Sequence, residues 1–318
     1  MRGAFGAGAS AIDLVASECS EIAVGSIPFN DLPRGPQQQG YRIYTQARAL
    51  YVAGMLDLTR SPRTEKVWLE VTSRCNLRCT YCHLSQDDIP EVDLDLRNID
   101  RFIAGLKSRG ATELIFNGRG ENTFLAGWQD VVHKALAIGL KVTTVTNLAL
   151  SYSEEEIKVL SRLTSITVSV DTTDPAIFRA IRRKADIKLV LTNILRIRAA
   201  AFAHDRRPPD IVWNMIVHDQ SMLDLARSVS EGIAAGVDQF HLSILGEKPE
   251  LPDALNARQI DRLSPQALSS GFEQIRRAHA LALANRRQMT MAPALNELLT
   301  ELGAKHRIEP HPKMSVYG

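Results

Sequence analysis

The chain reads Cys75-Asn76-Leu77-Arg78-Cys79-Thr80-Tyr81-Cys82 over one short stretch, and the rest of the sequence is organised around it. Its three cysteines have the spacing Cys-x3-Cys-x2-Cys, and only one other cysteine, Cys19, occurs in the 318 residues. Three thiolates on one short loop can hold a cubane [4Fe–4S] cluster. Because such a cluster has four irons, three thiolate ligands leave one iron open to bind a further ligand.

A structural zinc site is the main alternative for these cysteines. Closed zinc sites use four ligands, often three cysteines and one histidine, and His83 follows Cys82 directly. A neighbour at that spacing can rarely complete a tetrahedron with the other three residues, and no second Cys or His pair lies nearby. The spacing therefore favours the iron–sulfur cluster, with Cys75, Cys79 and Cys82 as its ligands.

Composition indicates an ordinary globular protein. Hydrophobic residues make up 45% and charged residues 23% of the chain, and the formal net charge is +2. This balance predicts no nucleic-acid partner, and the lack of an apolar run of about 18 residues predicts no membrane span. Acidic residues interrupt the apolar region that a signal peptide would need, and clustered cysteines argue against a disulfide framework. We therefore expect a cytoplasmic protein.

Strand-like and helix-like segments alternate from residue 66 onward. Strands are predicted at 66–73, 112–118, 140–147, 165–171, 210–218 and 238–246. Helices are predicted at 94–109, 124–138, 153–163, 175–203 (broken near 184–186) and 221–235. Six such steps without a hairpin signal predict an α/β fold with a parallel sheet and right-handed crossovers. The cysteine loop follows the first strand, at the face where barrels of this kind carry their chemistry.

Four regions follow from this pattern. Residues 1–40, rich in small and polar residues, are predicted to form a flexible arm, and 41–65 an N-terminal helix. Residues 66–250 are predicted to form the domain of alternating strands and helices, and 251–318 a C-terminal helical extension that is helical over 259–303 apart from an interruption at Pro293.

The cysteine run, with Tyr81 before its last cysteine, resembles the signature of the radical S-adenosylmethionine (radical SAM) superfamily. The resemblance implies a partial (β/α)6 TIM-type barrel over about 66–250, with S-adenosylmethionine (SAM) bound to the open iron. One electron then cleaves SAM to a 5′-deoxyadenosyl radical, which abstracts hydrogen from the substrate. It also implies an external electron donor such as flavodoxin or ferredoxin.

Several further positions match SAM-holding motifs of this family. Asn117-Gly118-Arg119-Gly120-Glu121 is similar to a Gly-Gly-Glu motif, although Asn122 stands where the family usually has proline. Gly118 and Gly120 would let the backbone approach SAM, and Glu121 would either accept a hydrogen bond from its ammonium group or orient the loop.

The ends of the next two strands carry the remaining SAM positions. Thr146-Asn147 is similar to Thr-Asn-Gly, with Leu148 in place of glycine, and Ser169-Val170-Asp171 is similar to a Ser-x-Asp motif near the ribose. Arg182 aligns with an arginine that faces the SAM carboxylate, a surface charge being its alternative. Tyr81 is expected against the cluster or adenine, or in the core.

Polar residues alternate with apolar ones along the predicted strands, and the polar set is expected to face the lumen. The predicted substrate-contacting set, in which either histidine could act as acid or base, is Glu70, Asn214, His218, His241 and Ser243. The alternative is that these groups only satisfy one another's hydrogen bonds.

A small polar metabolite is the predicted substrate. The segments Tyr44–Leu50 and Leu69–Cys79 together resemble radical SAM proteins of sugar and nucleoside natural-product biosynthesis. No cysteine follows Cys82 to build an auxiliary cluster, which favours carbon–carbon bond formation, rearrangement or elimination over net oxidation. The alternatives are a peptide-modifying radical SAM enzyme and a non-enzymatic metal-binding protein.

Overall fold

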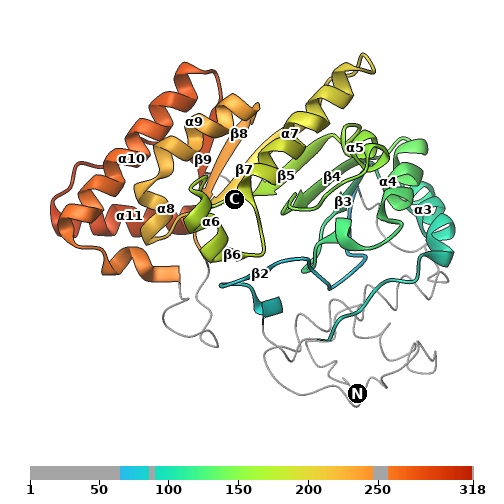
Figure 1. Ribbon diagram of the computed structural model, residues 1–318, viewed down its shortest axis with the longest axis horizontal. Helices are drawn as coiled ribbons and strands as arrows, with labels where there is room; N and C mark the ends of the chain where they lie inside the picture. Colours follow the sequence, from blue (N-terminus) through green and yellow to red (C-terminus); the bar gives the residue numbers. More distant parts are fainter. Residues whose placement is uncertain (1–64, 86–89, 246–256, 317–318) are drawn as a thin grey trace, which may run out of the picture. The chain divides into compact units, whose positions relative to one another are not determined.

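The computed structural model describes residues 65–85, 90–245 and 257–316 (Figure 1). The predicted arm over 1–40 and the predicted helix over 41–65 lie outside these residues, except for Glu65.

One parallel sheet forms the centre of the fold, in the strand order β1-β3-β4-β5-β7-β8-β9-β10. Its strands are β1 (Lys66–Leu69), β3 (Glu113–Phe116), β4 (Lys141–Thr146), β5 (Ser165–Ser169), β7 (Asp210–Ile216), β8 (Gln239–Ser243), β9 (Gln288–Met291) and the two-residue β10 (Ser315–Val316). Each of the six predicted strands is present and pairs in parallel with its neighbours. The predicted α/β partial barrel is therefore confirmed.

Helices follow the strands at the predicted places. They are α4 (Trp128–Ala137), α5 (Glu154–Leu160), α6 (Pro175–Ile181), α7 (Ile187–Phe202), α8 (Asp219–Leu223), α9 (Leu225–Ala235), α10 (Pro265–Ala284) and α11 (Pro293–His306). Short 3-10 helices in the same unit include η3 (His83–Ser85), η5 (Asn122–Phe124) and η7 (Ala257–Arg262). Helix α5 begins with a capping box in which Ser153 and Glu156 bond each other's backbone N–H groups, and α6 begins at Pro175 after the capping Asp174.

The C-terminal region differs from the prediction in one respect. Residues 288–291 were predicted to lie within a helix, but they form β9, which pairs with β8 and β10. Helix α10 ends at Ala284, and Arg286 has a left-handed φ of 56°. Pairing with the edge of β8 buries Met289 and Met291, and this tertiary gain outweighs the helical propensity of Gln and Met.

Residues 94–111 belong to a separate compact unit, whereas 66–93 and 112–318 belong to the unit that holds the sheet. The smaller segment contains η4 (Leu96–Asn98) and α3 (Ile99–Ser108), whose buried side chains Ile99, Ile103 and Leu106 share one stripe. The domain boundaries drawn from the sequence stay a prediction.

One face of the sheet packs against helices. A Cβ atom on Gly232 of α9 would lie 2.8 Å from the rings of both Trp213 and Phe240, which contact each other edge to face at 5.9 Å. Residues of this face on β5, β7 and β8 are fully buried, whereas the alternate residues keep partial exposure. These partly exposed residues make up what we call the inner face.

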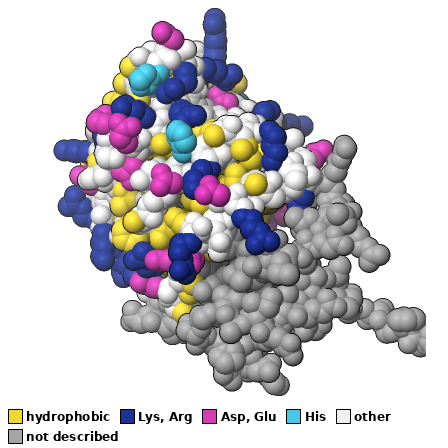
Figure 2. All heavy atoms as spheres, turned by 90° about the vertical axis from the view of Figure 1, so that its right-hand side faces the viewer, with side chains coloured by type: hydrophobic (Ala, Val, Ile, Leu, Met, Phe, Trp, Pro, Cys, Tyr) yellow, Lys and Arg dark blue, Asp and Glu magenta, His cyan; other side chains and the backbone are white. Residues whose placement is uncertain are grey.

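The outer surface shows no strong bias of charge on the side drawn in Figure 2. There, Lys and Arg side chains are interspersed with Asp and Glu, and hydrophobic side chains lie between them. None of the described helices combines the length and hydropathy needed to cross a bilayer.

Candidate active site

The cysteine loop leaves the carboxyl end of β1 and is folded by its own hydrogen bonds. Cys82 N donates to Cys79 O at 3.1 Å, and Ser85 Oγ donates to the same carbonyl at 2.6 Å. All three motif cysteines are free thiols; Cys79 is buried, and Cys75 and Cys82 are partly buried. The side chain of His83 lies outside the described part of the chain.

A small second sheet fixes the middle of this loop. Strand β2 (Arg78–Cys79) pairs antiparallel with β6 (Arg182–Arg183), so that Cys79 lies opposite Arg182. Thr80 N also donates to Ile181 O at 2.9 Å. The sequence predicted only a break in the helix near 184–186, yet this break is where the cysteine loop is attached.

Gly120 packs directly beneath the start of the cysteine loop. A Cβ atom there would collide with the carbonyl oxygens of Thr72 and Arg74 and would lie 2.7 Å from the carbonyl carbon of Ser73. Glu121 N donates to Arg74 O at 2.8 Å. No other residue type fits at position 120 without moving the backbone, which explains the glycine in the motif.

Glu70, predicted to contact the substrate, instead holds the glycine loop. Its Oε1 accepts hydrogen bonds from Arg119 N at 2.6 Å and Gly120 N at 3.4 Å. A Cβ atom on Gly118 would overlap the Glu70 side chain. Both motif glycines therefore lie in close contact with β1 or the chain that follows it.

Glu121 lies fully buried between the loops that follow β3 and β4. Its carboxylate accepts hydrogen bonds from Thr123 Oγ1 at 2.7 Å, Thr146 Oγ1 at 2.8 Å and Asn147 N at 2.7 Å. Burial raises the pKa of Glu121, and the hydrogen bonds, led by that from Asn147 N, oppose this rise. In this geometry the carboxylate orients both loops.

Asn147 reaches from the end of β4 to the first cysteine. Its Nδ2 donates to Asn76 Oδ1 at 2.8 Å and lies 3.7 Å from Cys75 Sγ, which also accepts from Leu77 N at 3.4 Å. Burial raises the pKa of the Cys75 thiol to about 12. The next residue, Leu148, has a left-handed φ of 51° and is fully buried, at the place where the family motif has glycine.

Asp171 and Arg182 form a buried ion pair. Arg182 Nε and Nη2 donate to the two carboxylate oxygens of Asp171, each at 2.9 Å, and the Tyr81 hydroxyl donates to the same carboxylate at 2.9 Å. The guanidinium carbon lies 5.6 Å from the centre of the Tyr81 ring. Burial alone would lower the pKa of Arg182, but the charge and hydrogen bonds of Asp171, together with the effects of Tyr81 and Cys79, outweigh burial and raise that pKa. Three predicted SAM-contacting residues thus contact one another.

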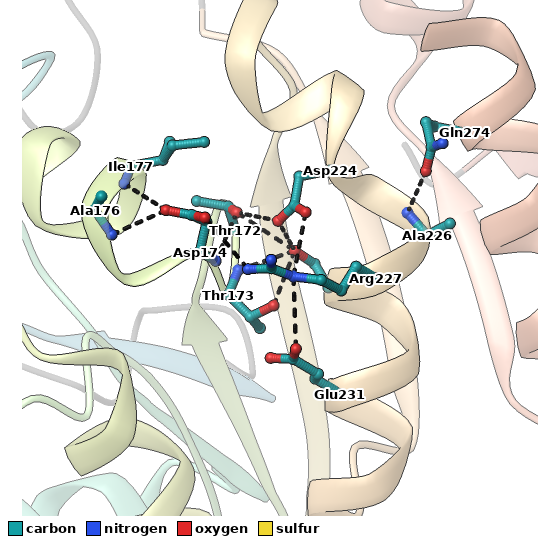
Figure 3. A network of polar contacts seen from close by, with 11 residues as sticks. Thr172, Thr173, Asp174, Ala176, Ile177, Asp224, Ala226, Arg227, Glu231 and Gln274 are labelled. Atoms are coloured by element: carbon teal, nitrogen blue, oxygen red, sulfur yellow. Dashed lines mark hydrogen bonds and ion pairs between the residues drawn. The ribbon is translucent and has the colours of Figure 1, made fainter. Parts of the chain in front are cut away.

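A polar network anchors the loop that follows Asp171 (Figure 3). Thr172 Oγ1 donates to Asp224 Oδ2 at 2.7 Å, and Thr173 N donates to Ser228 Oγ at 2.9 Å. Arg227 on α9 lies 3.5 Å from Asp174, 3.3 Å from Asp224 and 3.5 Å from Glu231. The sharp turn after β5 is thereby tied to α9, which fixes where Asp171 lies.

Polar side chains form a band across the inner face. Strand register places Ser169, Asn214, His241 and Thr290 side by side on β5, β7, β8 and β9. Ser243 Oγ donates to Asn214 Oδ1 at 2.9 Å, and His241 Nδ1 lies 2.9 Å from Thr290 Oγ1. Burial lowers the pKa of His241, so its imidazole is neutral near pH 7. Thr290 was not predicted as a site residue because the strand that carries it, β9, was not predicted.

His218 takes a different position from the other predicted substrate residues. It caps the N-terminus of α8, where its Nδ1 accepts from Ser221 N at 3.4 Å and lies 3.2 Å from Asp219 Oδ1. Its Nε2 is buried and has no hydrogen-bond partner in the described structure. The structure therefore brings together Asn214, His241 and Ser243, with His218 at a helix cap and Glu70 at the glycine loop.

The residues around the cysteines fit an iron–sulfur cluster. Cys75 Sγ accepts from Leu77 N and Asn147 Nδ2, and Cys79 lies opposite the cationic Arg182, as donors and charges lie near ligand sulfurs of such clusters. Among the described residues, no three His, Cys, Asp or Glu side chains converge on a point that suits one metal ion. A cubane cluster requires no such convergence, because each thiolate binds a different iron.

Residues 69–226 match the Radical SAM superfamily. This part of the chain is a radical SAM domain. Members of the family use a [4Fe–4S] cluster and SAM, and these are the cofactors of the domain. The resemblance seen in the cysteine run is thereby confirmed at the level of the superfamily, and with it an enzyme of the radical SAM class.

Relatives of the radical SAM domain have named functions. The chain is 33% identical over 144 residues to GTP 3′,8-cyclase of Bradyrhizobium diazoefficiens, covering 42% of this chain and 41% of that protein. It is 26% identical over 153 residues to the sporulation killing factor maturation protein SkfB of Bacillus subtilis, covering 48% and 36%. The chain thus spans less than half the length of either relative.

Among solved structures, Streptococcus suis SuiB bound to S-adenosylmethionine has the same fold. The TM-score is 0.53 at 14% identity, over 91% of this chain and 57% of that one.

Proposed function

We propose that the protein reductively cleaves SAM and uses the resulting radical to take a hydrogen atom from a small nucleoside- or sugar-like metabolite. The observation that supports this most strongly is the three-cysteine loop, which is held by hydrogen bonds to the segments that follow β3, β4 and β5. When bound, the cluster supplies the electron that cleaves SAM. The protein's own residues position the thiols and present a polar inner face to a polar ligand.

The substrate class rests on two supports. The inner band offers hydroxyl, amide and imidazole groups, which suit the hydroxyls and ring nitrogens of a nucleoside. A relative that matches the radical SAM domain is named for a reaction of GTP, a nucleotide. We assign substrate contacts to Asn214, His241 and Ser243, with Glu70 and His218 in supporting positions.

The remaining parts of this proposal come from the sequence. SAM is held by Gly118, Gly120, Glu121 and Asn147, with Ser169 and Asp171 near the ribose. Arg182 faces the SAM carboxylate, and Tyr81 lies against the cluster or adenine. The reaction forms a carbon–carbon bond, rearranges the substrate or eliminates a group, in the setting of natural-product biosynthesis. The electron donor is a cytoplasmic flavodoxin or ferredoxin.

A polypeptide substrate is the second candidate, because SkfB, one of the relatives, is a maturation protein. Both substrate classes would use the same cluster and SAM, so one screen of 5′-deoxyadenosine release with each class of compound can separate them.

The test is anaerobic reconstitution followed by measurement of 5′-deoxyadenosine. We expect about four irons per chain and release of 5′-deoxyadenosine with dithionite and SAM. Nucleosides, nucleotides and nucleotide sugars should increase this release, whereas peptide libraries should not. Replacing Cys75, Cys79 and Cys82 together by alanine should abolish iron binding and release, while Cys19→Ala serves as the matched control and should keep both. Stoichiometric zinc, or no 5′-deoxyadenosine from the loaded protein, would refute the proposal; stimulation by peptides alone would replace the substrate class.

A further inference from the structure

Arg182 is held in one position by the groups around it. Its side chain is 6% exposed and that of Asp171 is 0% exposed, and two parallel hydrogen bonds join them. Asp171 is fixed in turn by the Tyr81 hydroxyl and by Ile216 N, which donates at 3.3 Å. A bidentate pair of this kind sets the plane of the guanidinium group as well as its place.

This fixed cation lies against a cluster ligand. Arg182 is the strand partner of Cys79 in the β2–β6 pair, so its positive charge lies beside this cysteine and acts on its thiol. The other two cysteines receive no charged donor from the hydrogen bonds described above: Cys75 accepts only from a backbone N–H and the neutral amide of Asn147.

Stability alone gives no reason for this arrangement. A buried ion pair stabilises a fold no better, and often less well, than apolar side chains of similar volume. The positive charge does have an effect on a bound cluster, because one-electron reduction adds a negative charge to it. Charges and hydrogen bonds at ligand sulfurs are known to set cluster potentials, and Coulomb interactions act strongly at buried sites.

We propose that Arg182, held in place by Asp171, is a positioning residue that raises the reduction potential of the cluster through Cys79. This inference rests on the proposed function, since it presupposes the bound cluster. The step concerned is the uptake of one electron from an external reductant, dithionite in the test; no bond breaks and no proton moves. Asp171 partly offsets the charge of Arg182, so the two residues act on the potential in opposite directions.

The experiment is a redox titration of the reconstituted cluster without SAM, monitored by electron paramagnetic resonance. Arg182→Met should reduce the equilibrium constant for reduction at least tenfold, which is about 59 mV toward negative potential. Asp171→Asn should shift the midpoint in the positive direction. Arg183→Met serves as the matched control: it removes a neighbouring but exposed charge of β6 and should leave the midpoint unchanged.

Opposite shifts in the two variants cannot come from a loosened loop, which would move both in one direction. Shifts of the same sign, or no shift, would overturn the inference. A loss of SAM affinity in Arg182→Met with an unchanged midpoint would overturn it too, and would assign Arg182 to the SAM carboxylate. If the Arg182→Met variant does not hold about four irons, the Asp171→Asn variant decides the test. A positive shift of its midpoint supports the inference, and a negative shift or no shift overturns it. The unaltered protein tests the proposed function separately, through its iron content and 5′-deoxyadenosine release.

Discussion

Different kinds of interaction hold the two sides of the cysteine loop in place. On the Cys75 side, Gly120, Glu121 and Asn147 form what we call the glycine anchor, in which close backbone contact and hydrogen bonds fix the loop. On the Cys79 side, Tyr81, Asp171 and Arg182 form the ionic anchor, in which a buried ion pair fixes it. The glycine anchor restricts residue type through sterics, whereas the ionic anchor requires only that two opposite charges meet.

The largest loss in the free energy of unfolding is expected from breaking the ionic anchor. Asp171→Ala leaves the buried guanidinium of Arg182 without its partner, and removal of one member of a buried pair costs about 3–5 kcal/mol. Urea unfolding of the cluster-free chain measures this as a lower midpoint. The control is Arg207→Ala, whose side chain is 84% exposed in its pair with Asp210, so its loss should cost less than about 1 kcal/mol. Equal midpoints for the two variants would show that the ionic anchor contributes no stability.

A smaller effect is expected from the glycine anchor. In Gly120→Ala the new Cβ meets backbone atoms of residues 72–74, which can yield only if the chain moves. Overpacking of this kind costs about 1–3 kcal/mol, and displacement of the cysteine loop should reduce iron content well below four. Gly105→Ala is the matched control, because its Cβ meets nothing within 4 Å in the middle of α3; it should stabilise by about 0.5–1 kcal/mol. Full iron content in Gly120→Ala would contradict the steric argument.

The smallest effect concerns a neutral hydrogen bond beside the glycine anchor. The hydroxyl groups of Tyr152 and Thr123 lie 2.7 Å apart, both buried, and Thr123 also donates to Glu121. Tyr152→Phe should cost about 1 kcal/mol, the usual net value of one neutral hydrogen bond. Tyr81→Phe removes a bond to the charged Asp171 and should cost more, about 1.5–3 kcal/mol. Denaturant unfolding of both variants checks the order, and a reversed order would argue that charge does not distinguish the two anchors.

The sequence could predict features that depend on local pattern and local sterics, but not those that depend on pairing between distant residues. The strands were predictable because Val, Ile and Leu alternate with polar residues, and Gly120 because its motif reflects a local steric demand. Strand β9 was not, since Gln288 to Met291 is short and lacks β-branched residues other than Thr290. The two-residue strands β2 and β6 gave no pattern at all.

Pairing between distant residues was the other part that could not be predicted. Asp171 and Arg182 were each selected as site residues, but their mutual contact depends on the turn after β5 and the bend at β6. His218 was assigned to the lumen by strand parity, yet β7 ends at Ile216, so parity no longer applied and the side chain caps α8. Parity held for Asn214 and Ser243, which lie within their strands.

Leu148, in the turn next to Asn147, is hard to replace by glycine through a single substitution. Its left-handed backbone is one that leucine disfavours by about 1–2 kcal/mol, yet its side chain is fully buried. Its carbonyl accepts from Asn193 of α7 at 3.0 Å. A change to glycine would relieve the backbone but empty a core site, a loss of about 2–5 kcal/mol for a buried leucine. Glycine therefore becomes acceptable at position 148 only if the surrounding core changes to fill the space.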